Sequence, residues 1–458
     1  MIREDRCQQP IEHLPAAPLL PPTDLLYMAA TAEAAGSICR IRDYNLDGAS
    51  MADLVSDLVE FRPDWVVMNV ATPTLSKDLE VCQAAKKVNP SIVTVAKGAH
   101  FLTRSRETLE GYPALDLIIR GEPEHTLREL LEEKHRAEIR GLVWREEASG
   151  RIIVNADRPF NTNLDSLPYP ARHLIDNQRY SRPDNGQVQA VINVSRGCPY
   201  DCFFCLATTV SGKAGRRRSP GNIVGELREC VDKYHIRQFL FWSDLFNLDR
   251  NWACALCRAI IDSGLKITWA SNTRADTMDA ELARLMRQAG CRLVSMGVES
   301  GSQEILNQIG KRVTLEQIRK ASLALKRAGI QQYSYFVIGL PWDTEETVQQ
   351  TIRFAIELDS DYAIFFSAAA LPGSRFYDYA VQHGLFDGEN GNVFEQAYYY
   401  PATKGHHLSK ERIFELHESA VRRFYLRPRY IWNSALRVRS LRELGNYLRA
   451  ALAILRGG

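Results

Sequence analysis

Short apolar segments alternate with longer amphipathic segments along most of this 458-residue chain, and this alternation constrains the fold more than any other feature. The first series of apolar segments lies at residues 37–42, 65–70, 92–97 and 117–119. Short apolar runs separated by helical stretches are typical of parallel strands joined by helices. We therefore expect an α/β protein in which residues 1–135 form a doubly wound parallel sheet of the Rossmann type.

A second series of six strand-like segments begins near Gln187. These segments lie at residues 189–195, 236–244, 266–272, 292–300, 332–341 and 362–372, and the stretches between them, such as 220–234 and 314–328, have the period of amphipathic helices. A closed barrel of this type has eight strands. We therefore expect residues 187–384 to form a partial (β/α)6 TIM-type barrel with its active site at the carboxyl ends of the strands.

Two further regions separate and follow these series. Residues 136–186 are predicted to contain a hairpin at 141–155 and a proline-punctuated linker at 161–172. The alternation stops after about Gly384, and we expect residues 385–458 to form a C-terminal helical region. Between Ser419 and Gly458 this region carries nine arginines and a single acidic residue, Glu443, so it is strongly basic.

Composition excludes several classes of protein. The net charge of +2 gives no overall basic field of the kind that attracts nucleic acid. Ten cysteines at irregular spacing do not resemble the disulfide framework of a small secreted domain. Residues 1–15 lack the apolar core of a signal peptide, and no apolar run reaches the roughly 20 residues of a spanning helix. We expect a cytoplasmic protein with no membrane-spanning segment and no nucleic-acid partner.

Three cysteines, Cys198, Cys202 and Cys205, lie in a loop directly after the first strand of the second series. Thiolates so close together suit one soft metal centre. Most iron-sulfur sites use four cysteines, so a cluster held by three leaves one iron open to another ligand. Chance crowding, or a zinc site completed by a distant histidine, is the alternative. Cys254 and Cys257 are spaced as small apolar residues on one face of a helix.

The CxxxCxxC loop, with the aromatic Phe204 before its last cysteine, resembles the signature of the radical S-adenosylmethionine (SAM) superfamily. The resemblance implies a 4Fe-4S cluster on these cysteines, whose open iron binds the methionyl end of SAM, and reductive cleavage of SAM to a 5'-deoxyadenosyl radical. It also implies that residues at successive strand ends contact SAM. Besides Phe204, these candidates are Arg274, Glu299, Ser300, Gly339, Leu340 and Pro341.

Chemistry supports these candidates individually. The Arg274 guanidinium could bind the methionine carboxylate, and Glu299 could accept hydrogen bonds from the amino group or the ribose. A glycine at 339 would let the backbone approach the adenine. A structural salt bridge is the alternative for Arg274 and Glu299. Asp244 also follows a strand, where a functional contact and a helix cap are equally compatible with the sequence.

The order of elements in residues 1–135 is similar to the cobalamin-binding domain fused to one class of radical SAM enzymes. The resemblance implies that cobalamin lies on the loops 71–75, 98–102 and 121–125. Small residues there allow close approach of a flat macrocycle, and threonines can hydrogen-bond its nucleotide tail. The candidates are Thr72, Thr74, Gly98, Ala99, Gly121 and Glu122. There is no DxHxxG motif to supply a histidine to cobalt, and a sheet without ligand is the alternative.

Residues 216–220 match an RxRSP segment of the same class, in which Ser219 is predicted to begin a helix. For the three arginines before it, Arg216, Arg217 and Arg218, we expect a solvated basic turn; contact with phosphates of a cofactor or substrate is the alternative.

The family resemblance implies cobalamin-dependent methylation of an unactivated carbon in a small or lipid-like metabolite. Oxidative cyclisation or ring rearrangement, as in anaerobic porphyrin cyclases, is the first alternative. The second is a radical SAM enzyme with a cofactor-free front domain, and the third is a non-enzymatic iron-sulfur protein. An external one-electron donor such as a flavodoxin or ferredoxin is the expected partner.

The basic tail has two interpretations. Its arginines alternate with apolar residues, so it either packs on the barrel as a lid with its arginines in water or lies on an anionic membrane. The second interpretation predicts peripheral contact with the inner face of the membrane and a lipid substrate.

Overall fold

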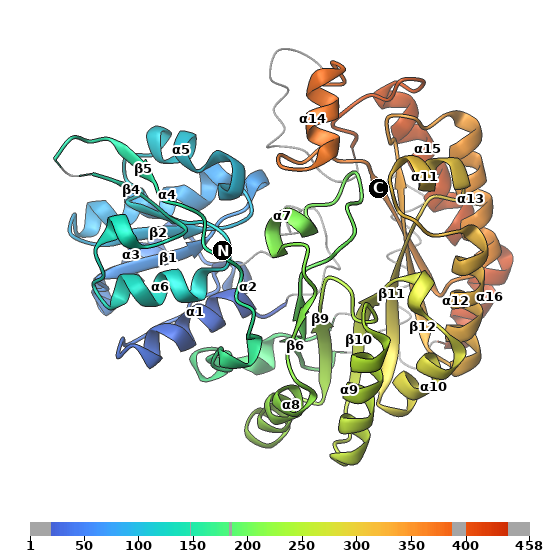
Figure 1. The fold of residues 1–458 in the computed structure, drawn as a ribbon, viewed down its shortest axis with the longest axis horizontal. Helices are drawn as coiled ribbons and strands as arrows, with labels where there is room; N and C mark the ends of the chain where they lie inside the picture. Colours follow the sequence, from blue (N-terminus) through green and yellow to red (C-terminus); the bar gives the residue numbers. More distant parts are fainter. Residues whose placement is uncertain (1–19, 147, 183–185, 387–399, 438–458) are drawn as a thin grey trace. The chain divides into compact units, whose positions relative to one another are not determined.

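The computed structural model describes residues 20–146, 148–182, 186–386 and 400–437 (Figure 1). The chain divides into two compact units. The first contains Met1–Tyr180 and Leu206–Arg218, and the second contains Ser181–Cys205 and Ser219–Gly458. None of the described helices is both long enough and apolar enough to cross a membrane.

The first unit is built on a five-stranded sheet in the order β1 to β5. The strands β1 (Trp65–Asn69), β2 (Val93–Lys97) and β3 (Leu117–Ile119) are parallel, as expected from the sequence. The hairpin expected at 141–155 forms β4 (Leu142–Arg145) and β5 (Ile152–Val154), which extend the sheet antiparallel to β3. An antiparallel edge of this kind is common on parallel sheets.

Helices cover both faces of this sheet, which is the predicted doubly wound arrangement (Figure 1). Successive strand residues point to opposite faces. Val95 and Leu117 pack with α1 (Thr23–Ala34) and α6 (Pro123–Leu131). Ala96 and Ile118 pack with α4 (Leu75–Val88) and α5 (Phe101–Gly111). Helix α3 (Met51–Phe61) packs against α4 and the start of the sheet.

The prediction of a strand at residues 37–42 is wrong. This segment has no strand partner and runs between α1 and α2 (Tyr44–Asp47). Cys39 and Ile41 pack against alanines of α1, while the Ile38 side chain is 88% exposed. Arg40 binds the Asp57 carboxylate of α3. The alternation of apolar and polar residues therefore reflects an extended segment lying on a helix, because one buried face gives the same pattern as a sheet.

The second unit contains a six-stranded, wholly parallel sheet whose spatial order follows the chain, as predicted. Its strands are β6 (Gln189–Asn193), β9 (Gln238–Trp242), β10 (Thr268–Thr273), β11 (Cys291–Glu299), β12 (Gln331–Ile338) and β13 (Tyr362–Ser367). The strands are connected by the helices α8 (Pro220–Tyr234), α9 (Arg250–Asp262), α10 (Ala280–Gln288), α11 (Gln303–Gln308), α12 (Leu315–Ala328) and α13 (Glu345–Leu358). Ser219 caps α8 as predicted, by accepting a hydrogen bond from the Asn222 N–H.

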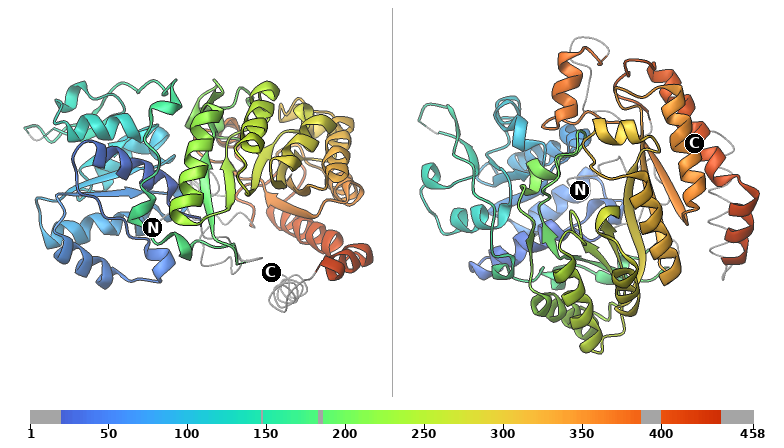
Figure 2. Two further views of the ribbon diagram at one scale, coloured as in Figure 1. Left: turned by 90° about the horizontal axis from the view of Figure 1, so that it is seen from below. Right: turned by 45° about the vertical axis from the view of Figure 1, so that its right-hand side comes forward.

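The last strand is followed by the helices α14 (Arg375–Gln382), α15 (Lys410–Tyr425) and α16 (Pro428–Arg437). Figures 1 and 2 show α15 beside the outermost strands, and the Tyr425 hydroxyl donates to the Ala363 carbonyl of β13 at 2.6 Å. Four of the tail arginines, Arg439, Arg442, Arg449 and Arg456, lie outside the described residues.

Candidate functional site

The cysteine loop leaves β6 at the carboxyl edge of the second sheet. The Gly197 N–H, just before Cys198, donates to the Asp244 carboxylate at 2.7 Å, and the Phe203 N–H donates to the Ile309 carbonyl at 2.9 Å. Asp244 is thus an anchor of the loop, while the following helix α9 is capped by Asp249. Cys198 is buried and Cys205 exposed, so the thiols run from the interior to the surface.

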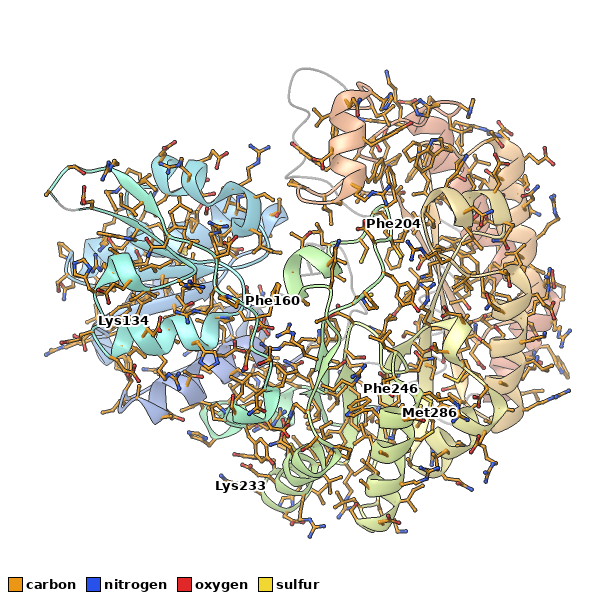
Figure 3. All side chains as sticks on the ribbon, in the orientation of Figure 1. Lys134, Phe160, Phe204, Lys233, Phe246 and Met286 are labelled. Carbon is orange, nitrogen blue, oxygen red and sulfur yellow. The ribbon has the colours of Figure 1, made fainter. Side chains whose placement is uncertain are left out.

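Aromatic packing holds the middle of this loop. The ring of Phe203 lies 4.8 Å from Trp342, 5.2 Å from Phe376 and 5.6 Å from Tyr379. Phe203 is buried, and its neighbour Phe204, which is labelled in Figure 3, is partly buried. Phe204 was selected as a SAM contact because it precedes the last cysteine of the motif, and that contact stays a prediction. The packing role of Phe203 was not predicted from the sequence.

Arg274 contacts this loop and a neighbouring segment. Its guanidinium lies 3.6 Å from the ring centre of Tyr200, and its Nε donates to Asp276 at 2.7 Å. Nη2 donates to the carbonyls of Lys311 and Arg312. A buried, planar guanidinium with these partners orients the loop. A contact between Arg274 and the SAM carboxylate stays a prediction.

Glu299, at the end of β11, is paired with a lysine that sequence reasoning missed. The Lys311 Nζ lies 2.6 Å from Oε1 of Glu299, and both side chains are about one-tenth exposed. Burial alone would lower the pKa of Lys311, but the Glu299 carboxylate holds it above its ordinary value. Glu299 also has a φ of 67°, which is uncommon for a residue with a side chain.

Both cationic side chains act on the cysteines. Burial raises the pKa of the Cys198 and Cys202 thiols, and the positive charges of Arg274 and Lys311 oppose this effect. A buried thiolate is stabilised by nearby positive charge, whether from side chains or from a bound metal centre.

The assignment of Cys198, Cys202 and Cys205 as ligands of one cluster stays a prediction. Nowhere in the described part of the chain do three His, Cys, Asp or Glu side chains converge on a point where one metal ion could bind. Three thiols that each bind a different iron of a cluster do not need to converge in this way. Cys254 and Cys257 lie in the apolar core on α9, as predicted.

The Gly339–Leu340–Pro341 segment follows β12 and is held by a buried carboxylate. Asp343 accepts hydrogen bonds at 3.0 Å from the N–H groups of Gly339 and Leu340. Gly339 has a φ of 91°, and a Cβ there would lie 2.7 Å from the Ile413 side chain. The glycine is therefore required by α15. Ser300 binds the Thr351 hydroxyl at 3.1 Å, so its side chain already has a structural partner.

In the first unit, two predicted cobalamin loops are built from short internal contacts. A Cβ on Gly98 would collide with the Val70 carbonyl, so this glycine brings two strand ends together. The Thr72 hydroxyl and the buried His100 ring lie 3.2 Å apart, and burial lowers the pKa of His100 to about 4. Thr74 donates to Asp78 at 2.6 Å. These contacts fix the loops as a platform, with Ala99 partly exposed on it.

In the third predicted cobalamin loop, the two candidate residues Gly121 and Glu122 have different surroundings. Around Gly121, a Cβ would meet no atom within 4 Å, so space is open there. Glu122 is engaged by Arg216, whose Nη1 donates to Oε2 at 2.9 Å while Nη2 lies 2.8 Å from Oε1. Arg216 also lies 4.9 Å from the ring centre of Phe160, a side chain that is labelled in Figure 3.

The prediction of a solvated basic turn at residues 216–218 is therefore wrong. Arg216 and Arg218 are buried, and Arg217 is partly buried. The guanidinium of Arg218 lies 5.5 Å from the ring centre of Tyr169. The reason is that residues 206–218 belong to the first compact unit, whose aromatic and acidic side chains surround these arginines.

Two family models match the chain at these sites. The radical SAM superfamily model matches residues 192–355, and the B12 binding domain model matches residues 15–131. The first match includes the cysteine loop, Arg274, Glu299 and the Gly339–Pro341 segment. The second includes all three loops of the predicted cobalamin platform.

Comparison with individual proteins agrees with these models. An uncharacterized methyltransferase of Pyrococcus horikoshii is 31% identical over 90% of this chain and 89% of its own length. An anaerobic magnesium-protoporphyrin IX monomethyl ester cyclase of Rubrivivax gelatinosus is 27% identical over 90% of this chain and 75% of its own. The fold is similar to that of the radical SAM methyltransferase TsrM from Kitasatospora setae, whose structure contains cobalamin and a 4Fe-4S cluster. The TM-score is 0.69 and the sequence identity is 19%, over 81% of this chain and 77% of that one.

The buried Asp343 carboxyl predicts a measurable pH dependence of stability. Burial raises its pKa to about 6, against its hydrogen bonds, so the folded state holds this proton more tightly than the unfolded state does. Stability should fall by about 3 kcal/mol as the pH rises from about 4 to above 6. Asp343→Asn, which can still accept from the two N–H groups, should remove this fall in urea unfolding at a series of pH values. Glu346→Gln, on the exposed start of α13, should leave it in place; an identical pH profile for Asp343→Asn would contradict the assignment.

Proposed function

We propose, on the premise that this chain belongs to the radical SAM enzymes with a B12 binding domain, that it methylates a carbon atom of a small or lipid-like metabolite. The cofactors of this family are a 4Fe-4S cluster, SAM and cobalamin, and the chain is an enzyme. The observation that carries the methylation proposal is the similarity to the Pyrococcus methyltransferase, which extends over 90% of this chain.

When bound, the cofactors would supply the chemistry: reductive cleavage of SAM at the cluster would generate the radical that takes a hydrogen atom from the substrate, and cobalamin would carry the methyl group. One substrate C–H becomes C–CH3 while two SAM molecules and two external electrons are consumed. The co-products are deoxyadenosine, methionine and S-adenosylhomocysteine in equal amounts. This balance requires the external one-electron donor.

The residues of the chain position these groups. Cys198, Cys202 and Cys205 hold the cluster on a loop that Asp244, Phe203 and Arg274 fix in place. The Gly339–Pro341 backbone, oriented by Asp343, provides a surface for the adenine. Glu299 carries the negative charge that suits the amino group of SAM. In the first unit, the platform of Thr72, Thr74, Gly98 and Ala99, with the open space at Gly121, receives cobalamin.

Oxidative cyclisation is the second candidate function, because the Rubrivivax cyclase is also similar over 90% of this chain. The two reactions differ in their co-products. Cyclisation oxidises the substrate without adding a methyl group, so it yields deoxyadenosine without a matching amount of S-adenosylhomocysteine. The enzyme relatives disfavour a non-enzymatic iron-sulfur protein, and the B12 binding domain match disfavours a cofactor-free front domain.

The cysteine assignment and the reaction can be tested together. Reconstituted anaerobically, the Cys198→Ala, Cys202→Ala and Cys205→Ala variants should lose iron-sulfur absorbance and deoxyadenosine formation, because each removes an iron ligand. The double variant Cys254→Ala/Cys257→Ala is the matched control and should keep both. With a substrate found by anaerobic product screening, equal amounts of deoxyadenosine and S-adenosylhomocysteine should form. A triple variant with a full cluster would disprove the site, and deoxyadenosine alone would favour cyclisation.

We also propose that the C-terminal region contacts an anionic membrane surface. The structure combines features of both interpretations of the tail. Up to Tyr430 it packs like a lid, and Arg427, predicted to lie in water, donates to the Ile356 carbonyl at 2.9 Å. Beyond that point, α16 exposes an apolar face on which Ile431, Trp432 and Leu436 are 52%, 68% and 70% exposed.

The occupant of this face can be inferred from charge. Large apolar side chains are seldom grouped and exposed on a free surface. A helix with exposed Trp and Leu beside arginines is typical of segments that lie in an anionic lipid interface. The excess of arginine over acidic residues from Ser419 onward complements such a surface, with about 1 kcal/mol for each arginine near it. A lipid-like substrate would agree with this location.

Vesicle binding tests this surface. The full-length protein should co-sediment with phosphatidylglycerol vesicles at low salt, less at high salt, and little with phosphatidylcholine vesicles. Trp432→Ser/Leu436→Ser should weaken binding at least about tenfold, because apolar area is lost from the interface. Val381→Ser, which removes an apolar side chain that is 57% exposed on α14, should bind as the unaltered protein does. Equal binding by the double variant would contradict the proposal.

A further inference from the structure

The segment that follows the cysteine loop, residues 206–218, is packed along its length within the first unit, to which it belongs. A Cβ on Gly212 would lie 2.7 Å from the ring of Phe160, so a glycine is needed where the segment passes this ring. At the end of the segment, Nη1 of Arg218 donates to the Tyr27 hydroxyl of α1 at 3.4 Å. The segment is therefore an integral part of the unit that contains the predicted cobalamin loops.

Arg216 makes the most extensive connection of this segment. Its guanidinium binds both oxygens of the Glu122 carboxylate, at 2.8 and 2.9 Å. The same group donates to the carbonyls of Asn161 and Ser211, at 2.8 and 2.7 Å. A planar guanidinium suits this arrangement because its N–H donors have fixed directions. Arg216 thus joins its own segment to the linker and to the third predicted cobalamin loop, residues 121–125.

Glu122 is held by two parts of the unit at once. Besides binding Arg216, its Oε2 accepts from the Asn161 N–H at 2.9 Å. The preceding residue, Gly121, has a φ of 75°, and a Cβ there would meet no atom within 4 Å. The network therefore lies one residue away from the open space in this loop. A carboxylate engaged in this way sets the position of the loop.

Burial makes this connection difficult to replace. The side chains of Arg216 and Glu122 are only 6% and 11% exposed. If one member of a buried ion pair is removed, the other remains as an uncompensated charge, and the surrounding chain must shift or admit water to relieve it. The position of loop 121–125 therefore depends on a residue that follows the cysteine loop in the chain.

We propose that Arg216 is a positioning residue for cobalamin: by holding Glu122, it fixes loop 121–125 in the shape that receives the cofactor. The inference rests on the proposed function, in which the first unit binds cobalamin. It goes beyond that function because it extends the cobalamin site to residues 206–218, outside the B12 binding domain match at 15–131. It also gives Glu122 an indirect role in place of the predicted contact with cobalamin.

Binding of hydroxocobalamin to the full-length protein, followed by visible absorbance, is the first readout. In Arg216→Met the dissociation constant should rise at least about tenfold, because the loop loses its preorganised position. Glu122→Gln should weaken binding in the same direction. The loss in the double variant Arg216→Met/Glu122→Gln should be close to that of one single variant, because both changes remove one shared connection. The double variant has no unpaired buried charge, so it remains measurable if a single variant fails to fold.

Lys86→Met is the matched control. Lys86 pairs with Asp116 at 2.7 Å in the same unit, with side chains 25% and 31% exposed. Asp116 directly precedes β3, so this pair lies at the amino ends of the strands, opposite the edge that carries the predicted cobalamin loops. Its loss should lower the free energy of unfolding and leave the dissociation constant for cobalamin unchanged.

Hydrogen–deuterium exchange distinguishes a connection to the cofactor from a purely structural role. In the unaltered protein, cobalamin should slow amide exchange in residues 206–218 as well as in residues 121–125. In the double variant, exchange in residues 206–218 should no longer respond to cobalamin. A network that only stabilises the unit would leave this response intact in the double variant, and that result would overturn the inference.

The outcomes separate this inference from the proposed function. If the unaltered protein and the double variant bind cobalamin equally well, the inference is wrong and the cobalamin assignment stands. If the unaltered protein binds no cobalamin while its three cysteines hold a cluster, the cobalamin part of the proposed function fails, and the inference fails with it.

Discussion

The hydrogen bonds that tie the cysteine loop to neighbouring strand ends are the interactions on which the site depends. Within this loop, Phe203 is buried among aromatic side chains and holds the middle of the loop. Around it, the loop is held by Asp244 at its start, by the Ile309 carbonyl in its middle, and by Arg274 against Tyr200. These groups come from different βα units. The position of the thiols is thus a property of the assembled sheet.

The parallel arrangement of the second sheet makes this possible. Because all six strands run in one direction, their carboxyl ends share one edge, and residues far apart in sequence meet there. Lys311 illustrates the consequence. It lies after α11, outside any strand, yet its pairing with Glu299 and the backbone contacts of its segment bring a buried cation to the loop. A buried ion pair needs both members, since either alone would be an uncompensated charge.

The first unit uses a different principle. Its predicted ligand loops are fixed by a close backbone approach at Gly98 and by side-chain hydrogen bonds that satisfy Thr72, Thr74 and His100 internally. A platform of this kind presents a fixed surface with small exposed residues, on which a large flat cofactor can lie. It does not need a dedicated ligand side chain. The buried Glu122–Arg216 pair shows that residues following the cysteine loop belong structurally to this unit.

The amino-acid sequence alone determined the α/β class, the order of the parallel strands in the two sheets, the three cysteines and the strand-end candidates, because hydrophobic period and motif spacing are local properties. It did not determine which candidates have structural partners. The structure assigned Glu299 to Lys311, Glu122 to Arg216 and Ser300 to Thr351, and it placed 37–42 on a helix. Asp343 and Phe203 also became visible only in three dimensions. The physical reason is that a pattern reports which side of a segment is buried, whereas a partner across the fold depends on how separate segments pack.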